Sequence, residues 1–284
     1  MFLRPVCAIS AIPIARPGAG ELGQARPPSA WRKAPAAILG AGLGLRCSAR
    51  PRPYRSSCQY RPGGALETGA GSSPSAGVSV CCLLVLLLLG MIVSQDASPV
   101  VVLDQAVREA VQGQNSGVEA KDFNDLSNKL DDLGQLLAYV SSGASAFALG
   151  DGGLLMLLAV PGGLQGVRLG QRGLKEFFHR SRPSQILTDF SYPSAHTARF
   201  VFCLALIACV LLPKVQNSTT QGRAKPTEWV TTAVVAWIIM GSTRVLADAH
   251  WLSDTAGGAC LGTSAAALVD VGLVHLGQIF MGEK

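Results

Sequence analysis

The chain has 284 residues, of which 49% are apolar and 15% are charged, a balance too apolar for an ordinary soluble domain of this size. The net charge of the whole chain is +6, but residues 1–77 alone carry +8, because they hold ten Lys/Arg against Glu21 and Glu67, and the rest of the chain carries about −2. A basic excess confined to a Pro- and Arg-rich leader, with no aromatic platform beside it, argues for targeting rather than for binding of nucleic acid, whether DNA or RNA. The apolar composition indicates a membrane protein.

Residues 1–77 come first in the chain, and we expect them to be a disordered leader. They contain ten of the sixteen prolines and too little apolar surface to form a core. An Arg-rich, Ser-containing, acid-poor segment is typical of an organelle transit peptide, and an overlong translation start is the alternative. The leader therefore favours an organelle membrane, above all the plastid envelope, with the endoplasmic reticulum or plasma membrane as alternatives.

Hydrophobic segments fill most of the remaining chain. The run at 78–93 predicts a membrane span or a signal-peptide core. Residues 94–133 hold eight acids and three bases, with apolar residues at helical spacing, as surface helices do. Further spans are predicted at 134–149, 153–169, 195–213, 229–243 and 256–281. The expected fold is an all-α, polytopic membrane bundle of about six transmembrane helices over residues 78–284.

The charges of the loops predict how this bundle lies in the membrane. Basic short loops stay on the cytoplasmic side, which places the leader, the 214–228 loop and the C-terminal tail there. Residues 170–194 and 244–255 then share the opposite, non-cytoplasmic face. Side chains from these two segments are expected to meet.

The first of these segments contains the sequence LKEFFHRSRPS. Lys175 and Arg182 are seven residues apart, so on a helix that continues to Pro183 they would project from one face. His179 and Arg180 lie between them and are expected to be solvated or to contact lipid headgroups. The segment thus predicts two cations at the membrane face.

The sequence SYPSAHTARF predicts the start of a helix. Pro193 and Ser194 precede the apolar run, and Ala195 and His196 fall in its first turn. The unpaired N–H groups and the positive dipole end of a helix start bind phosphate readily.

The sequence GSTRVLADAHWLSDTAGG supplies a third group of polar residues. Arg244 ends a predicted span, and His250 and Asp254 are four residues apart on one helix face. The carboxylate could therefore orient the imidazole, as in many activated nucleophiles. Asp248 is expected to face away from His250.

The three groups together match a family pattern. K-x6-R-P, P-S-A-H and R-x5-H-x3-D follow one another in order, and this resembles the type 2 phosphatidic acid phosphatase superfamily, whose pattern is KxxxxxxRP, PSGH and SRxxxxxHxxxD. The resemblance covers roughly residues 100–284 and implies that His250 takes the phosphoryl group as a phosphohistidine. It implies that Asp254 orients His250 and that His196 protonates the leaving oxygen. The implied phosphate-binding residues are Lys175, Arg182, Ser194, Ala195 and Arg244.

Two positions depart from this pattern. Ala195 replaces the usual glycine and Thr243 replaces the usual serine. Alanine accepts helical backbone angles and threonine keeps the hydroxyl, so we expect these changes to tune activity rather than abolish it.

The resulting expectation is a phosphatase that hydrolyses a phosphate monoester or diphosphate on a lipid, at the non-cytoplasmic face, without a metal or cofactor. The lipid would be of the phosphatidic acid or polyprenyl diphosphate class. The chain has no GxxxxGK[ST] or HExxH motif and few carboxylates near the site. Two alternatives stay open: a catalytically weak or inactive lipid-binding relative, and a vanadate-dependent haloperoxidase. The sequence does not indicate an oligomeric state.

Overall fold

The structure is a computed structural model that describes residues 73–95, 98–114, 120–149, 153–184, 189–216 and 223–281. The predicted leader, apart from residues 73–77, lies outside the described residues. The regular elements of the described part are helices throughout, which confirms the all-α class. These helices are α1 (Pro74–Val93), α2 (Pro99–Gln114), α3 (Ala120–Leu149), α4 (Leu154–Phe178), α5 (Ala195–Ala205), α6 (Leu212–Gln216), α7 (Pro226–Leu246) and α8 (Leu252–Met281), with a π-helical stretch at Leu206–Leu211 between α5 and α6.

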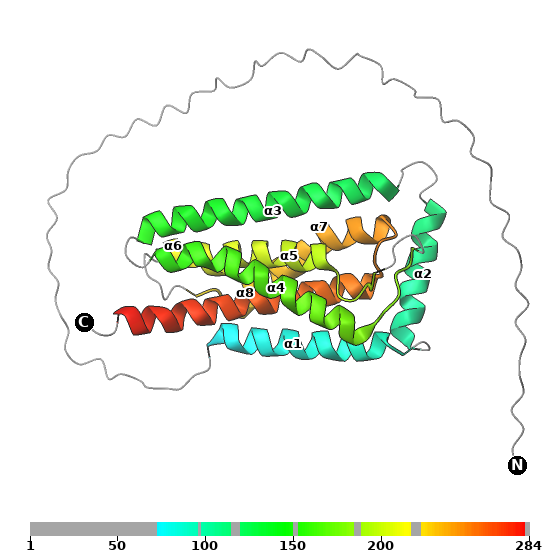
Figure 1. Ribbon diagram of the computed structural model, residues 1–284, viewed down its shortest axis with the longest axis horizontal. Coiled ribbons are helices and arrows are strands. Elements are labelled where there is room, and N and C mark those ends of the chain that lie inside the picture. The colour runs from blue at the N-terminus through cyan, green and yellow to red at the C-terminus, as the bar shows by residue number, and fades with distance from the viewer. Residues whose placement is uncertain are drawn as a thin grey trace, which may run out of the picture. The chain divides into compact units, whose positions relative to one another are not determined.

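The long helices run side by side, and α2 crosses one end of the bundle (Figure 1). Helices occupy all six predicted span positions. Among the described residues, four helical stretches are long and apolar enough to cross a membrane: α1, Ala195–Gln216, α7 and Leu252–Ile279. Helices α3 and α4 occupy the other two predicted positions but carry more polar residues. The sequence separates a surface helix from a span at residue 134, whereas the structure has one helix from 120 to 149, because the helical spacing continues across that point.

The outer faces of α1 and α7 are apolar. Large aliphatic side chains on α1 and α7 are about half exposed, among them Leu84, Leu88, Val230 and Ile238. Such a surface would be unfavourable in water and is suited to lipid. The chain is therefore an integral membrane protein.

Helix α8 lies at the centre of the bundle and approaches α5 very closely. A Cβ atom at Gly258 would lie 2.6 Å from the Ser194 carbonyl oxygen, and one at Gly262 would overlap the Ala198 carbonyl. Glycine is therefore required at both positions, and the small-xxx-small spacing is the one that lets membrane helices touch backbone to backbone. This contact fixes the start of α5 against the start of α8.

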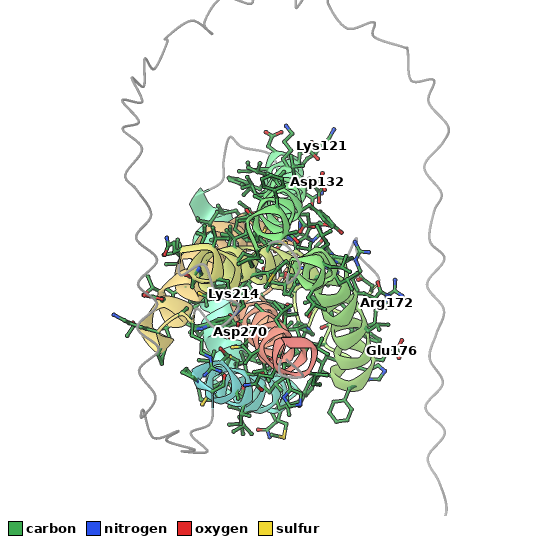
Figure 2. The ribbon with its side chains drawn as sticks, turned by 90° about the vertical axis from the view of Figure 1, so that its left-hand side faces the viewer. Lys121, Asp132, Arg172, Glu176, Lys214 and Asp270 are labelled. Carbon is green, nitrogen blue, oxygen red and sulfur yellow. The ribbon has the colours of Figure 1, made fainter. Side chains whose placement is uncertain are left out.

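A buried ion pair lies toward the other end of α8. Lys214 Nζ is 2.6 Å from Asp270 Oδ1, and both side chains are inaccessible to solvent (Figure 2). Ser75 at the start of α1 donates to Asp270 Oδ2 at 2.5 Å. These residues, which we call the Lys214 cluster, join α1, α6 and α8.

Candidate active site

The candidate site lies at the end of the bundle that α2 crosses. Helix α4 ends there because His179 adopts a left-handed conformation (φ 49°) and its N–H donates to the Lys175 carbonyl. The predicted continuation of this helix to Pro183 is therefore wrong. Arg182 lies four residues beyond the helix, in an irregular segment, and does not share a helix face with Lys175.

Lys175 and Arg182 nevertheless converge, because both bind the carboxylate of Asp189. Lys175 Nζ and Arg182 Nη2 each donate to Asp189 Oδ2 at 2.8 Å, and Arg182 Nε lies 2.7 Å from Oδ1. The two cations are mostly buried, whereas the Asp189 side chain is 59% exposed. Burial alone would raise the pKa of Asp189, but its hydrogen bonds with Arg182 and Lys175 hold it well below the usual range. The exposed carboxylate of Asp189 thus binds both cations on their solvent side.

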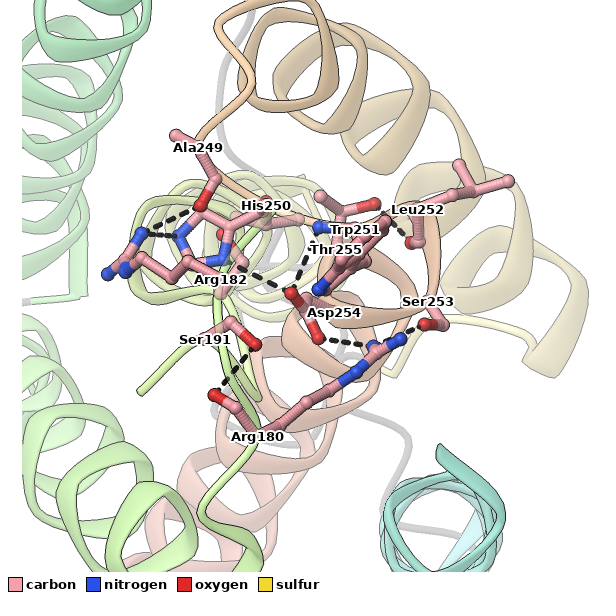
Figure 3. Close-up of polar contacts among 12 residues, drawn as sticks. Arg180, Arg182, Ser191, Ala249, His250, Trp251, Leu252, Ser253, Asp254 and Thr255 are labelled. Carbon is pink, nitrogen blue, oxygen red and sulfur yellow. Dashed lines mark hydrogen bonds and ion pairs between the residues drawn. The ribbon is translucent and has the colours of Figure 1, made fainter. Parts of the chain in front are cut away.

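Arg182 also contacts the predicted nucleophile. Its Nη1 lies 3.2 Å from His250 Nε2 and donates to the Ala249 carbonyl at 2.8 Å (Figure 3). Arginine can only donate, so Nε2 must be the acceptor and neutral His250 carries its proton on Nδ1. The lone pair of Nε2 is therefore on the side of the phosphate-binding cations.

Asp254 lies on the other side of the imidazole. His250 precedes α8 rather than sharing its face, which corrects the predicted helical pairing, yet Asp254 Oδ2 still lies 3.6 Å from His250 Nδ1. This distance is longer than a hydrogen bond, and buried Nδ1 has no hydrogen-bond partner. Catalytic hydrogen bonds are often long without ligand and shorten in the substrate complex.

Burial dominates the protonation of His250. It lowers the pKa of the imidazole from 6.5 to about 4, against the opposing effect of Asp254. The positive charges of Arg182 and Arg244 lower this pKa further. His250 is therefore neutral at pH 7, as a nucleophile must be.

The start of α5 lies directly against these residues. Ser194 is the N-cap of the helix, as predicted, and its backbone N–H donates to the Asp254 carbonyl at 2.9 Å. The Ser194 hydroxyl accepts from Thr197 at 3.1 Å. Ala195 and His196 form the first turn, and both are incompletely buried. The predicted helix start is confirmed, and it lies beside the start of α8.

Arg244 is placed differently from the other cations. It is 4% exposed, and its Nη1 donates to Asn124 and Ser127 of α3, each at 2.7 Å. Its Nε is buried without a hydrogen-bond partner. The hydroxyl of Thr243, the residue before Arg244, donates to the Met240 carbonyl of its own helix at 2.8 Å rather than to a site residue. Arg244 thus keeps its Nε–H uncommitted and able to bind a ligand.

Arg180 corrects a further expectation, and Asp248 has a partner that the sequence did not indicate. Arg180 is buried rather than solvated and donates to Asp254 Oδ1 at 2.6 Å. Asp248 is paired with Arg108 of α2 at 2.8 Å. Sequence spacing could not reveal these contacts, because the partners are 74 and 140 residues apart.

The family model of the PAP2 superfamily matches residues 153–272, a range that contains all three motif groups. Residues 153–272 belong to the PAP2 superfamily. The site described above is therefore the place where the PAP2 motifs meet. Within the described ranges, no three His, Cys, Asp or Glu side chains come together as they would around a metal ion.

A solved structure shares this fold. It is the crystal structure of a transmembrane PAP2-type phosphatidylglycerolphosphate phosphatase from Bacillus subtilis, with 24% sequence identity and a TM-score of 0.51. The alignment covers 70% of this chain and 96% of that chain. No curated protein matches the chain significantly. The PAP2 assignment thus rests on the motif-bearing region and on a similar helical fold.

Proposed function

We propose that this PAP2-superfamily protein hydrolyses a phosphate monoester or diphosphate on a lipid, through a phosphohistidine formed on His250. The observation that carries the proposal is the contact of Arg182 Nη1 with His250 Nε2 at 3.2 Å. It supports the proposal because it indicates a proton on Nδ1, and because Arg182, which we propose binds phosphate, lies beside the nitrogen that would attack phosphorus. Arg182 also lies close to Lys175, because both side chains bind the carboxylate of Asp189.

In the first step the phosphate displaces Asp189 from Lys175 and Arg182, and Arg182 Nη1 moves from Nε2 of His250 to a phosphate oxygen, which frees the Nε2 lone pair. Nε2 of His250 then forms a bond to phosphorus while the bond from phosphorus to the leaving oxygen breaks. Lys175, Arg182 and the free Nε of Arg244 neutralise charge on the equatorial oxygens, and the Ser194 hydroxyl adds a donor at the start of α5. Ala195 forms the backbone beside this position. Asp254 stabilises the imidazolium proton on Nδ1.

His196 performs the proton transfers in this scheme. It donates a proton to the leaving oxygen in the first step. In the second step it accepts a proton from water, whose oxygen bonds to phosphorus as the bond to Nε2 breaks. The phosphohistidine is thereby hydrolysed, and His196 returns to its starting state. The cations supply the charge neutralisation, so the scheme needs no metal.

The surroundings of the site favour a lipid over a small phosphate ester. An apolar cavity of about 270 Å³ lies between α1, α7 and α8, and Trp237, Ala256 and Cys260 are among its lining residues. Ala256 follows Asp254 by two residues, so the cavity reaches the first turns of α8, on a different side of the helix from Asp254. An acyl or prenyl chain could remain there while its phosphate reaches the cations. The printed name of the Bacillus protein is also that of a lipid phosphatase.

We place the site at the non-cytoplasmic face of the membrane, because the basic loop at 214–228 and the tail favour the cytoplasmic side. Phosphatidic acid and a polyprenyl diphosphate are the leading substrates. Phosphatidylglycerolphosphate, the substrate in the name of the Bacillus protein, is the third to test.

The decisive experiment measures phosphate release from these three lipids by the full chain in detergent micelles containing chelator. We expect release that survives chelation, is lost in His250→Ala and is kept in the control Arg172→Gln, which changes an exposed residue of α4 (Figure 2). Alkali-stable labelling of wild type by radioactive phosphate, absent from His250→Ala, would identify the phosphohistidine. Release that requires a divalent metal or persists in His250→Ala would overturn the mechanism, and silence on all three lipids would overturn the lipid phosphatase assignment.

A further inference from the structure

Arg180 is a buried cation that the proposed reaction leaves unused. Its side chain is 8% exposed and donates to Asp254 Oδ1 at 2.6 Å, Ser253 Oγ at 2.7 Å and Asp104 Oδ2 at 2.6 Å (Figure 3 shows the first two). Asp254 and Asp104 are themselves buried, on α8 and α2. One guanidinium thus binds two buried carboxylates from different helices.

The contacts of Asp254 show what Arg180 does to the catalytic pair. Oδ1 of Asp254 binds Arg180, and Oδ2 accepts the Trp251 N–H at 3.0 Å and faces Nδ1 of His250. A carboxylate held through both oxygens cannot rotate away from the imidazole. Arg180 therefore fixes the direction in which Oδ2 points.

Asp104 connects the same network to α2. Its Oδ1 accepts the Ser253 N–H at 3.0 Å, and its Oδ2 accepts the Ser253 hydroxyl. Ser253 lies in the first turn of α8, where backbone N–H groups have no partner within the helix. A side chain from α2 thus caps α8 immediately before Asp254.

A second ion pair joins α2 to the other side of His250. Arg108 lies one turn after Asp104 and binds both oxygens of Asp248, at 2.8 and 3.0 Å. The Trp251 ring lies within 5.6 Å of the guanidinium carbon of Arg108 and within 5.5 Å of that of Arg180. Helix α2, which crosses this end of the bundle (Figure 1), therefore holds the chain on both sides of the nucleophile.

We propose that Arg180 and Asp104 are positioning residues for the His250–Asp254 pair, and that α2 completes the site by holding them in place. The inference rests on the proposed function, because it assigns a role within that reaction. Arg180 acts through Asp254, and both of its terminal guanidinium nitrogens, Nη1 and Nη2, already bind protein oxygens. Losing it should therefore reduce kcat far more than it changes KM.

Removing Arg180 also changes the charge around His250. The charged and titratable groups near the imidazole come from four elements: Asp254 of α8, Arg180 and Arg182 of the segment after α4, Arg244 of α7 and His196 of α5. Without Arg180, Asp254 and Asp104 keep their negative charges but lose the cation that binds both. We therefore expect the pKa of His250 to rise in Arg180→Gln, and to return toward the wild-type value when Asp104→Asn is added.

The test compares Arg180→Gln, Arg180→Lys, Asp104→Asn and the double variant Arg180→Gln/Asp104→Asn with the control Arg172→Gln, on whichever lipid wild type hydrolyses. We expect Arg180→Gln to reduce kcat about 10- to 100-fold, with KM changed less than about threefold. Arg180→Lys keeps the charge and should retain more activity. The double variant should recover part of the activity lost in Arg180→Gln, because it restores the charge balance.

A titration of His250 separates this proposal from the proposed function. It follows the imidazole by NMR in histidine-labelled full chain and needs no turnover. A higher pKa in Arg180→Gln, reversed in the double variant, supports the positioning role even if no lipid is hydrolysed. An unchanged pKa together with a kcat equal to that of Arg172→Gln would overturn it, and so would a loss confined to KM.

Discussion

Two groups of charged side chains lie near the two ends of α8, and they differ in their exposure to solvent. In the Lys214 cluster, Lys214 and Asp270 are both enclosed by protein and lie 2.6 Å apart. At the other end, Lys175 and Arg182 share Asp189, whose side chain is 59% exposed. Asp254 and Asp270 are sixteen residues apart, so the two groups are separated by about 24 Å along the helix.

This difference distinguishes a structural ion pair from a binding site. A fully buried pair can exchange neither partner for a ligand, and its value lies in holding helices together. Cations that are paired with an exposed carboxylate can exchange that carboxylate for another anion. A phosphate is suited to this exchange, because it also presents two oxygens to a guanidinium. The exposure of Asp189 is thus the feature that favours this end, which we call the open end, as the proposed site. The end with the Lys214 cluster is the closed end.

The largest expected effect comes from removing a cation of the open end. Arg182→Ala takes away both a phosphate donor and the contact with Nε2 of His250. We expect kcat/KM to fall about 1000-fold, measured as initial rates of phosphate release. Lys175→Ala removes only a phosphate donor and should lose less. A loss below about tenfold for Arg182→Ala would mean that this end is not where phosphate binds.

The closed end should respond in stability and not in catalysis. Lys214→Met leaves the carboxylate of Asp270 buried without its cation, so we expect the free energy of unfolding to fall by about 3–5 kcal/mol. Unfolding by titration with SDS would measure it, and Lys214→Met/Asp270→Leu should recover most of the loss. The kcat per folded molecule should stay at the wild-type value. A reduced kcat in the folded fraction would contradict the separation of the two ends.

His250 provides a test of burial at the open end. Its pKa is lowered from 6.5 to about 4, so NMR should show the neutral imidazole until the pH approaches 4. The unfolded chain takes up this proton near pH 6.5. The contribution of His250 to stability is therefore fully present above pH 6.5 and is lost as the pH falls toward 4. Protonation near pH 6.5 in the folded protein would show that the imidazole is open to water.

The smallest effect concerns Asp189 itself. Asp189→Asn removes the anion that competes with phosphate for Lys175 and Arg182. Inorganic phosphate should then inhibit phosphate release more strongly, with an inhibition constant lowered about tenfold. Asp189→Glu keeps the charge and serves as the control. Weaker inhibition of Asp189→Asn would show instead that Asp189 is needed to orient the two cations.

Much of the site follows from local sequence. The three motif groups predict the phosphate-binding region, and Ser194 is the N-cap that the sequence indicates. The helix ends around the other two groups are not predictable from spacing, because His179 ends α4 through a left-handed backbone and His250 precedes α8. The expected side chains still meet in both cases. Lys175 and Arg182 share Asp189, and His250 faces Asp254.

The contacts of α2 lie beyond what local sequence can show. Arg180 resembles any juxtamembrane cation until its partner is known, and Asp104 is 76 residues earlier in the chain. Asp189 is likewise one acid among many, and only the fold places it on Lys175 and Arg182. Charges that compensate one another across long sequence separations are determined by tertiary packing.

The glycine contact between α5 and α8 has a consequence for how such a protein can diversify. Gly258 and Gly262 join the two helices so closely that their starts form one unit, which carries Ser194, His196 and Asp254. Mutations that alter the spacing of these groups would meet backbone atoms and are strongly disfavoured. Substitutions of the exposed aliphatic side chains on α1 and α7, such as Leu84 and Ile238, leave that unit intact. Substrate preference can therefore change through these helices while the chemistry at the centre is inherited unaltered.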